Sequence, residues 1–90
     1  GPVVVERYDA AIQSLVPYFR AGREECPPDV LSRLSATTEE ALVGGMVSLI
    51  SRRIFAGRTE ELESLLPDLV EFTLTPYLGS AKAAKVAREG

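Results

Sequence analysis

The side chain best suited by type to nucleophilic chemistry in this 90-residue chain is its single cysteine, Cys26. A cysteine attacks as a thiolate, which forms beside a base or beside cations. Cys26 instead follows two acids, Glu24 and Glu25, and the sequence contains no histidine that could accept its proton. We therefore expect no catalytic cysteine. A lone cysteine without a disulfide partner also fits a reducing compartment.

Two pairs of adjacent glutamates, at 39–40 and 60–61, are the other candidates for chemistry. Two carboxylates act as general acid and base only where an apolar setting raises the pKa of one of them. Both pairs lie at the expected start of a helix, where the positive end of the helix dipole already accounts for acidic residues. Without histidines or a lysine-bearing glycine-rich loop, we expect no enzyme active site, no metal site and no cofactor.

The overall charge of the chain excludes some partners. Its 10 basic and 13 acidic residues give a net charge of -3, and the basic residues are scattered along the chain. Binding to nucleic acid would require clustered arginines and lysines, so these residues are not expected to contact DNA or RNA. No apolar run approaches the about 18 residues of a membrane span, and no signal peptide is visible. We expect a cytoplasmic protein without a membrane partner; Gly1-Pro2 is either a tag remnant or a natural turn.

Three helical stretches are expected to position these residues, because apolar side chains recur with a 3.6-residue period. The first runs from Val3 to about Ala21, the central one from Thr38 to Gly57, and the last from Thr59 to Leu78. Gly22, Gly57 and Gly79 supply their C-terminal stops. The segment at 22–37 is expected to be a loop with one short helical turn. No strand is indicated, so the fold class is all-α.

Prolines and small residues leave details of these helices open. Pro17 should kink the first helix. Pro67 either kinks a continuous last helix or begins a second one, and we favour the restart. Gly44-Gly45 either lies within one helix or marks a loop between two shorter ones; the unbroken apolar phase favours one helix. Residues 80–90 contain few apolar anchors, so a frayed helix or disorder is expected there.

The central and last helices have more apolar surface than a single neighbour would cover. Large apolar side chains span an arc of roughly 160° on the central helix and about 200° on the last, against roughly 100° for an ordinary surface helix. Each mid-helix glycine costs about 1 kcal/mol, so Gly44-Gly45 suggests close approach by another helix. A chain of this length also buries only about 60 to 65% of its unfolded surface. The sequence therefore predicts a small helical domain that associates.

Residues 39–79, EEALVGGMVSLISRRIFAGRTEELESLLPDLVEFTLTPYLG, resemble the C-terminal portion of bacterial TetR/AcrR-type transcriptional regulators. The first helix, ERYDAAIQSLVPYFRAGRE, resembles the helix before that pair in the same family, and ALVGG, Arg52-Arg53 and TPYLG are the most specific pieces. The resemblance implies an antiparallel helical bundle whose last two long helices form a four-helix bundle with a second subunit. Residues 1–79 would then be a ligand-sensing and dimerisation domain and 80–90 a C-terminal tail.

The resemblance also implies a function. A member of this family is a homodimer that represses transcription until a small apolar or amphipathic effector shifts its two subunits to an arrangement that no longer fits the operator. Operator DNA would be bound only through an N-terminal helix-turn-helix, and none is visible in these residues. Whether a full-length member represses or activates is left open by the sequence.

Two sets of residues are candidates for these roles. For the dimer interface the set comprises Ala41, Gly44, Gly45, Ser48, Arg52, Leu65, Leu69, Phe72 and Pro76. For the effector pocket it comprises Tyr8, Ile12, Leu15, Phe19, Met46 and Ile50, where aromatic and flexible apolar groups of two helices would converge. Ordinary core packing is the alternative for each leucine, isoleucine and methionine. An ion pair of Arg52 or Arg53 with Glu71 or Asp68 is a further possibility.

Two other functions remain open. The chain could be a self-contained adaptor that binds another protein's helix in the groove left by its apolar faces. It could also be a structural fragment of a helical enzyme, although no titratable constellation supports that reading. An upstream helix-turn-helix in the coding sequence would favour the regulator, whereas an upstream stop codon or an unrelated domain would favour the adaptor.

Overall fold

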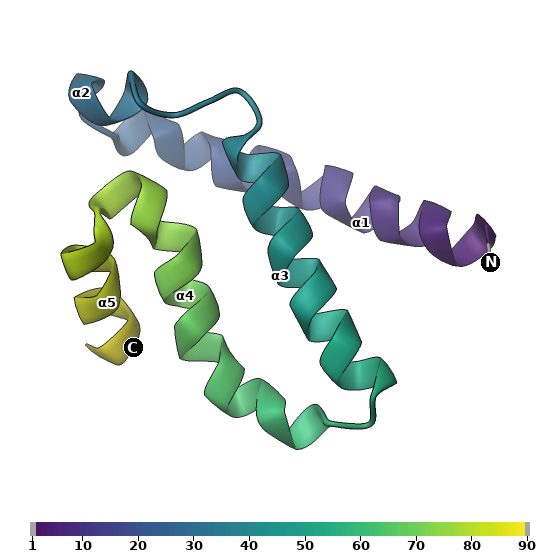
Figure 1. Cartoon of the computed structure of the whole chain (residues 1–90). Coiled ribbons are helices and arrows are strands. Elements are labelled where there is room, and N and C mark those ends of the chain that lie inside the picture. The colour runs from purple at the N-terminus through teal and green to yellow at the C-terminus, as the bar shows by residue number, and fades with distance from the viewer. Residues whose placement is uncertain (1, 90) are drawn as a thin grey trace. The chain divides into compact units, whose positions relative to one another are not determined.

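The computed structural model describes residues 2–89, together with their side chains except those of residues 2–5 and Tyr8. All the regular structure in this range is helical, which confirms the all-α prediction (Figure 1). The elements in chain order are α1 (Pro2–Ala21), the 3-10 turn η1 (Gly22–Glu25), α2 (Pro28–Leu31), α3 (Thr38–Phe55), the 3-10 turn η2 (Thr59–Glu61), α4 (Leu62–Leu78) and α5 (Ser80–Glu89).

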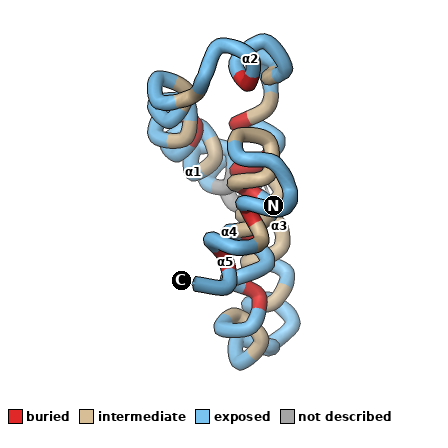
Figure 2. The backbone as a smooth tube through the Cα atoms, turned by 90° about the vertical axis from the view of Figure 1, so that its left-hand side faces the viewer, coloured by how far each residue is buried: buried red, intermediate tan, exposed pale blue. Residues whose placement is uncertain are grey.

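The chain divides into two compact units. The first unit is Gly1–Val47 and the second unit is Ser48–Gly90, so that α3 contributes its beginning to the first and its end to the second. Buried positions are few and are interspersed with exposed ones along the helices, as Figure 2 shows in red and pale blue. Such a distribution is expected of short amphipathic helices, each of which buries one stripe and exposes the rest.

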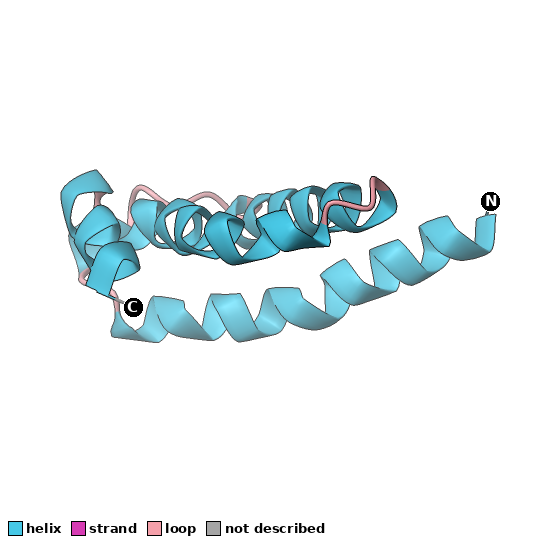
Figure 3. Ribbon diagram, turned by 90° about the horizontal axis from the view of Figure 1, so that it is seen from below, coloured by secondary structure: helices cyan, strands magenta, loops and turns pink. Residues whose placement is uncertain are grey.

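In the first unit, α1 passes through Pro17 without ending. The proline ring removes the hydrogen bond that its N–H would donate to the C=O of Gln13. The helix continues to Ala21, and its ribbon curves along its length in Figure 3. Val16 is buried while Pro17 is exposed, so the side that lacks the hydrogen bond faces solvent.

The central helix α3 is continuous through Gly44 and Gly45, which rules out a loop at the two glycines. The C=O of Thr37 accepts a hydrogen bond from the N–H of Ala41 at 3.0 Å. This is the first bond of the helix, so Thr37 occupies the N-cap position that its type favours.

In the second unit, α3 ends at a glycine in the left-handed conformation, as the sequence predicts. Gly57 has a φ of 72°, which costs an L side chain energy but not glycine. The N–H of Gly57 donates to the C=O of Ile54 at 3.0 Å, and the N–H of Arg58 donates to the C=O of Arg53 at 2.8 Å. These two bonds form a Schellman motif, which satisfies carbonyls that the helix end would leave open.

The predicted restart at Pro67 is wrong, because α4 runs unbroken from Leu62 to Leu78. Pro67 lies early in the helix, and its missing N–H leaves one open carbonyl, that of Glu63. Leu65 and Leu69, on either side of the proline, are both buried. We infer that burial of this face outweighs the loss of one hydrogen bond.

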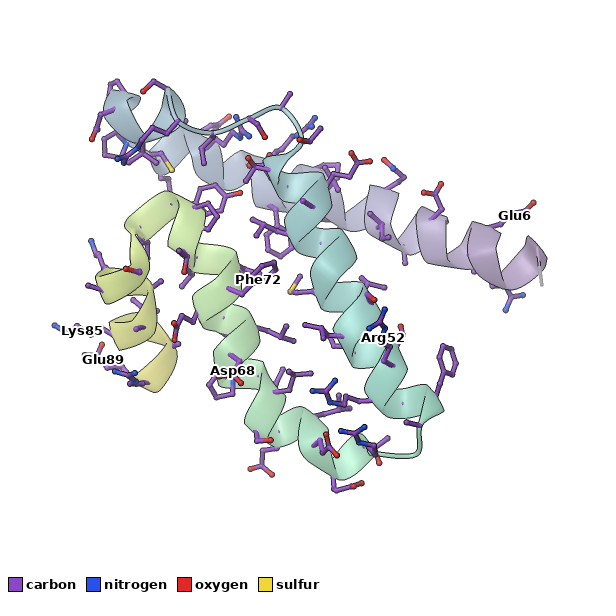
Figure 4. The ribbon with its side chains drawn as sticks, viewed as in Figure 1. Glu6, Arg52, Asp68, Phe72, Lys85 and Glu89 are labelled. Atoms are coloured by element: carbon purple, nitrogen blue, oxygen red, sulfur yellow. The ribbon has the colours of Figure 1, made fainter. Side chains whose placement is uncertain are left out.

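Disorder or a frayed helix after Gly79 is also wrong, because Ser80–Glu89 forms the helix α5, which packs against α4. Its buried side chains are Ala83 and Ala87 rather than large anchors. Alanine is the strongest helix former, and its small side chain allows a close approach between helices. Lys85 and Glu89 project from the side of α5 away from α4 (Figure 4).

A single residue, Gly79, joins α4 to α5. Its N–H donates to the C=O of Thr75 at 2.9 Å, and its C=O accepts from the N–H of Ala83 at 3.0 Å. Gly79 therefore caps the end of one helix and the start of the next. Its φ of 86° with a ψ of 159° is a combination that is essentially restricted to glycine.

Replacing Gly79 with alanine is expected to lower the free energy of unfolding by about 1–3 kcal/mol, the usual cost of forcing an L residue into such a conformation. The matched control is Gly44→Ala. A Cβ at Gly44 meets no heavy atom within 4 Å outside the helix backbone, so this change should leave stability unchanged or raise it by about 1 kcal/mol. Urea denaturation followed by circular dichroism measures both changes. Equal effects of the two substitutions would contradict the role given to Gly79.

Candidate functional site

A fully buried carboxylate, that of Glu39, lies in the first turn of α3 in the first unit. Its neighbour Glu40 is exposed, although the sequence treats the two acids as equivalent residues at a helix start. Glu39 precedes the buried residues Leu42 and Val43 by three and four positions, which places all three on one helix face. An acid in phase with an apolar stripe is the local signal by which Glu39 could have been recognised.

Two arginines near the end of α1 neutralise this carboxylate. Arg23 of η1 donates from Nε to Glu39 Oε2 at 2.7 Å and from Nη2 to Oε1 at 2.8 Å. This bidentate arrangement is the strongest geometry of an arginine–carboxylate pair. Arg20 makes a looser ion pair, with its Nε 3.6 Å from Glu39 Oε1. We call this cluster of Arg20, Arg23 and Glu39 the arginine clamp.

The arginine clamp also holds the loop that precedes α3. Arg20 Nη2 donates to the C=O of Ala36 at 2.7 Å, and Arg23 Nη2 donates to the C=O of Ser35. From the sequence alone, arginines at the end of a helix are expected only to interact favourably with the helix dipole. In the structure, these two arginines tie α1 and η1 to the loop and to the start of α3, all within the first unit.

A second charged cluster, in the second unit, surrounds Glu61 of η2. Arg58 donates from Nε to Glu61 Oε2 at 2.5 Å and from Nη2 to Oε1 at 2.7 Å. Arg53 Nε lies 3.0 Å from Oε1 as an ion pair, but this buried nitrogen has no partner in hydrogen-bonding geometry. Arg53 thus forms an ion pair with Glu61, whereas the sequence suggested Glu71 or Asp68. The cluster braces the turn between α3 and α4.

Hydrogen bonding within this cluster makes stability depend on pH. The hydrogen bond from Arg58 is the main cause that lowers the pKa of Glu61 below 4.5, and the same bond raises the pKa of Arg58. A carboxyl whose pKa is lower in the folded state stabilises the fold above its unfolded pKa, and this contribution is lost as the pH falls through the folded value.

We therefore expect the melting temperature of the chain to exceed that of the Glu61→Gln variant at pH 7 by a small margin, since the pair is largely solvated. That margin should shrink as the pH falls below about 4.5. Thermal melts of both proteins between pH 7 and pH 3 measure it. A margin that is constant over this range would show that the carboxylate charge of Glu61 contributes nothing.

The structure leaves the predicted effector pocket untested. Ile12, Phe19 and Met46 are half-buried and Leu15 is exposed in the first unit, while Ile50 is half-buried in the second. The side chain of Tyr8 lies outside the described part of the chain. The two described cavities have other linings, which are Arg20, Arg23 and Ala36 for one and Glu63, Leu66, Pro67, Val70 and Ala87 for the other.

The predicted dimer interface also stays a prediction, and its members differ in exposure. Phe72, Ala41 and Arg52 are exposed, whereas Leu65 and Leu69 are buried within the chain. The half-buried members are Gly44, Gly45, Ser48 and Pro76. The exposed and half-buried members are the ones whose surface a second subunit could still cover.

The remaining candidate chemistry is sparse in residues 2–89. The thiol of Cys26 is half-buried, with its Sγ 3.5 Å from the C=O of Gly22. No group of three or more Cys, Asp or Glu side chains in the described residues is placed to hold a metal ion. A search of the same residues for a helix with the length and hydropathy of a membrane span finds none.

Comparison of the chain with protein families, with curated proteins and with solved structures finds no match.

Proposed function

We propose that this chain is a helical association module that forms a homodimer and serves as the effector-sensing part of a bacterial TetR/AcrR-type transcriptional regulator, acting as a repressor. The exposed apolar surface of the second unit supports association. The resemblance of residues 39–79 supports the assignment to a regulator.

The observation that carries association is a set of large apolar side chains that the second unit leaves in water. Phe55 is 77% exposed and Leu66 is 55% exposed. Ile54, Val70, Phe72, Leu78 and Val86 are exposed as well. Fully burying one such side chain is worth about 1.5–3 kcal/mol. Several such exposed side chains on a unit of this size favour binding to a partner over exposure to solvent.

A second copy of the chain is a partner of suitable charge. The second unit has six acidic and six basic residues, so two copies carry no net repulsion between these units. Acids lie on α4, at Glu63, Asp68 and Glu71, while α5 carries the cations Lys82, Lys85 and Arg88. A two-fold arrangement, in which the same patch meets itself, can place unlike charges opposite one another.

In this proposal, a small apolar or amphipathic effector controls the dimer. The DNA-binding helix-turn-helix would lie outside these residues and would read the operator in the major groove. The effector would bind one arrangement of the two subunits better than the other and shift their population. The pocket residues on α1 and α3 named above are its proposed site.

The Gly44→Leu substitution tests the interface. Because a Cβ at Gly44 meets no heavy atom within 4 Å outside the helix backbone, a larger side chain should fit the single chain and improve helix propensity. In the dimer, the same side chain would overpack the helix crossing. We expect the dissociation constant to rise at least about 10-fold by sedimentation equilibrium, a cost of about 1.4 kcal/mol. Gly44→Ala is the small-residue control. A dissociation constant that Gly44→Leu leaves unchanged would show that the interface lies elsewhere.

A specific groove favours the adaptor as the second candidate function. It lies between α4 and α5, has a volume of about 370 Å³, and is lined by Leu66, Pro67, Val70, Ala87 and Glu63. A mostly apolar groove of this kind suits the apolar face of an amphipathic helix from another protein. The upstream coding sequence separates the two functions, since about 45 to 60 residues with a helix-turn-helix are expected for the regulator only.

A further inference from the structure

An open cavity of about 300 Å³ lies beside the arginine clamp and is lined by Arg20, Arg23 and Ala36. We propose that this cavity binds an oxyanion, namely the carboxylate or phosphate group of a small molecule. Its lining residues belong to the first unit. None of them is among the residues proposed for the dimer interface or for the effector pocket.

The carboxylate of Glu39 holds the two guanidinium groups of the arginine clamp unequally. Arg23 is committed to Glu39 at 2.7 and 2.8 Å, whereas Arg20 stands 3.6 Å away, with its side chain 52% exposed. Arg20 is therefore the member whose charge a ligand can still use. Among the described residues, those that line this cavity are Arg20, Arg23 and Ala36, none of which is acidic.

The loop beside the cavity adds neutral hydrogen-bonding groups. The hydroxyl oxygens of Ser35 and Thr37 lie 3.2 Å apart, and those of Ser35 and Thr38 lie 3.1 Å apart. The same loop leads into α3 at Thr38, and the start of a helix carries a partial positive charge that favours anions. The hydroxyls and the helix start thus belong to the same loop as Ala36, which lines the cavity.

The chemistry of arginine narrows the class of ligand. The planar guanidinium matches the geometry of carboxylate and phosphate oxygens, and its N–H groups only donate hydrogen bonds. A cation would be repelled by the two guanidinium groups that line the cavity, and an apolar ligand would cover the half-exposed Arg20 without offering it an acceptor. The cavity therefore suits an oxyanion, held mainly by Arg20 with Arg23 as a fixed neighbour.

The test is a nuclear magnetic resonance titration of the intact chain with inorganic phosphate and, separately, with acetate, at constant ionic strength set by chloride. We expect saturable shifts in the amide signals of residues 35–40 at millimolar anion. A stronger response to phosphate would indicate a tetrahedral ligand group, and a stronger response to acetate would indicate a planar one. The absence of saturable shifts with both anions would overturn the proposal.

Matched variants assign the binding to this cavity. Arg20→Gln should weaken it at least about 10-fold, a change worth about 1.4 kcal/mol. Arg20→Lys, which keeps the charge but loses the planar fork, should weaken it less. Arg33→Gln makes the same charge change at an exposed arginine that does not line the cavity and should leave affinity unaltered. Equal weakening by Arg20→Gln and Arg33→Gln would overturn the proposal, because it would show a general charge effect.

Discussion

Replacing Arg23 with methionine is expected to lower the free energy of unfolding of the first unit by about 3–5 kcal/mol, the usual cost of removing one partner of a buried ion pair. Glu39 is fully buried, and Arg23 donates two short hydrogen bonds to it, at 2.7 and 2.8 Å. Arg20 makes a longer ion pair with Glu39, at 3.6 Å, so we expect it to offset only part of the loss. Hydrogen exchange of the α3 amides near Glu39 measures the loss in the unit concerned.

Two further variants keep this prediction testable even if Arg23→Met fails to fold. The exposed Arg33→Met is the matched control and should change stability by less than about 0.5 kcal/mol. The double variant Arg23→Met/Glu39→Leu removes both charges and should regain most of the lost stability, because apolar residues often replace a buried ion pair at no cost. A double variant as unstable as Arg23→Met alone would show that the buried charge of Glu39 is not the cause.

Replacing Leu69 with alanine is expected to lower the free energy of unfolding by about 2–5 kcal/mol. Leu69 is only 4% exposed and lies on the same face of α4 as the buried residues Leu65 and Thr73. Truncation removes apolar burial and leaves a cavity that the backbone of a helix cannot close. Urea denaturation followed by circular dichroism gives the value.

Leu66 offers the matched control for this truncation. It stands three positions before Leu69 on the same helix but is 55% exposed, so Leu66→Ala should cost less than about 1 kcal/mol. The same change should weaken association, since Leu66 belongs to the apolar surface proposed for a partner. Equal losses of stability at the two positions would contradict the claim that burial of Leu69 stabilises the second unit.

Periodicity in the sequence predicts the helices whose buried stripes consist of large side chains. The stretches assigned to α1, α3 and α4 all form helices, and Gly57 and Gly79 end α3 and α4 with positive φ angles. The same periodicity does not predict α5, because the buried stripe of this helix consists of Ala83 and Ala87. The weight given to Pro67 as a breaker is also misplaced, because packing of the residues around it outweighs one missing hydrogen bond.

The arginine clamp could be predicted only in part. Arg23 and Glu39 are sixteen positions apart, and no local period relates residues across a loop of that length. The phase of Glu39 with Leu42 and Val43 indicates a buried acid, which must have a cationic partner. The choice between Arg20, Arg23 and Arg33 as that partner depends on the path of the loop, which the sequence pattern does not specify.

Association of this chain with a second copy is the central claim, and sedimentation equilibrium of the unaltered 90-residue chain tests it most directly. At tens of micromolar, we expect a species with twice the mass of one chain, in reversible equilibrium with the monomer on dilution. A single species with the mass of one chain across this concentration range would contradict the claim.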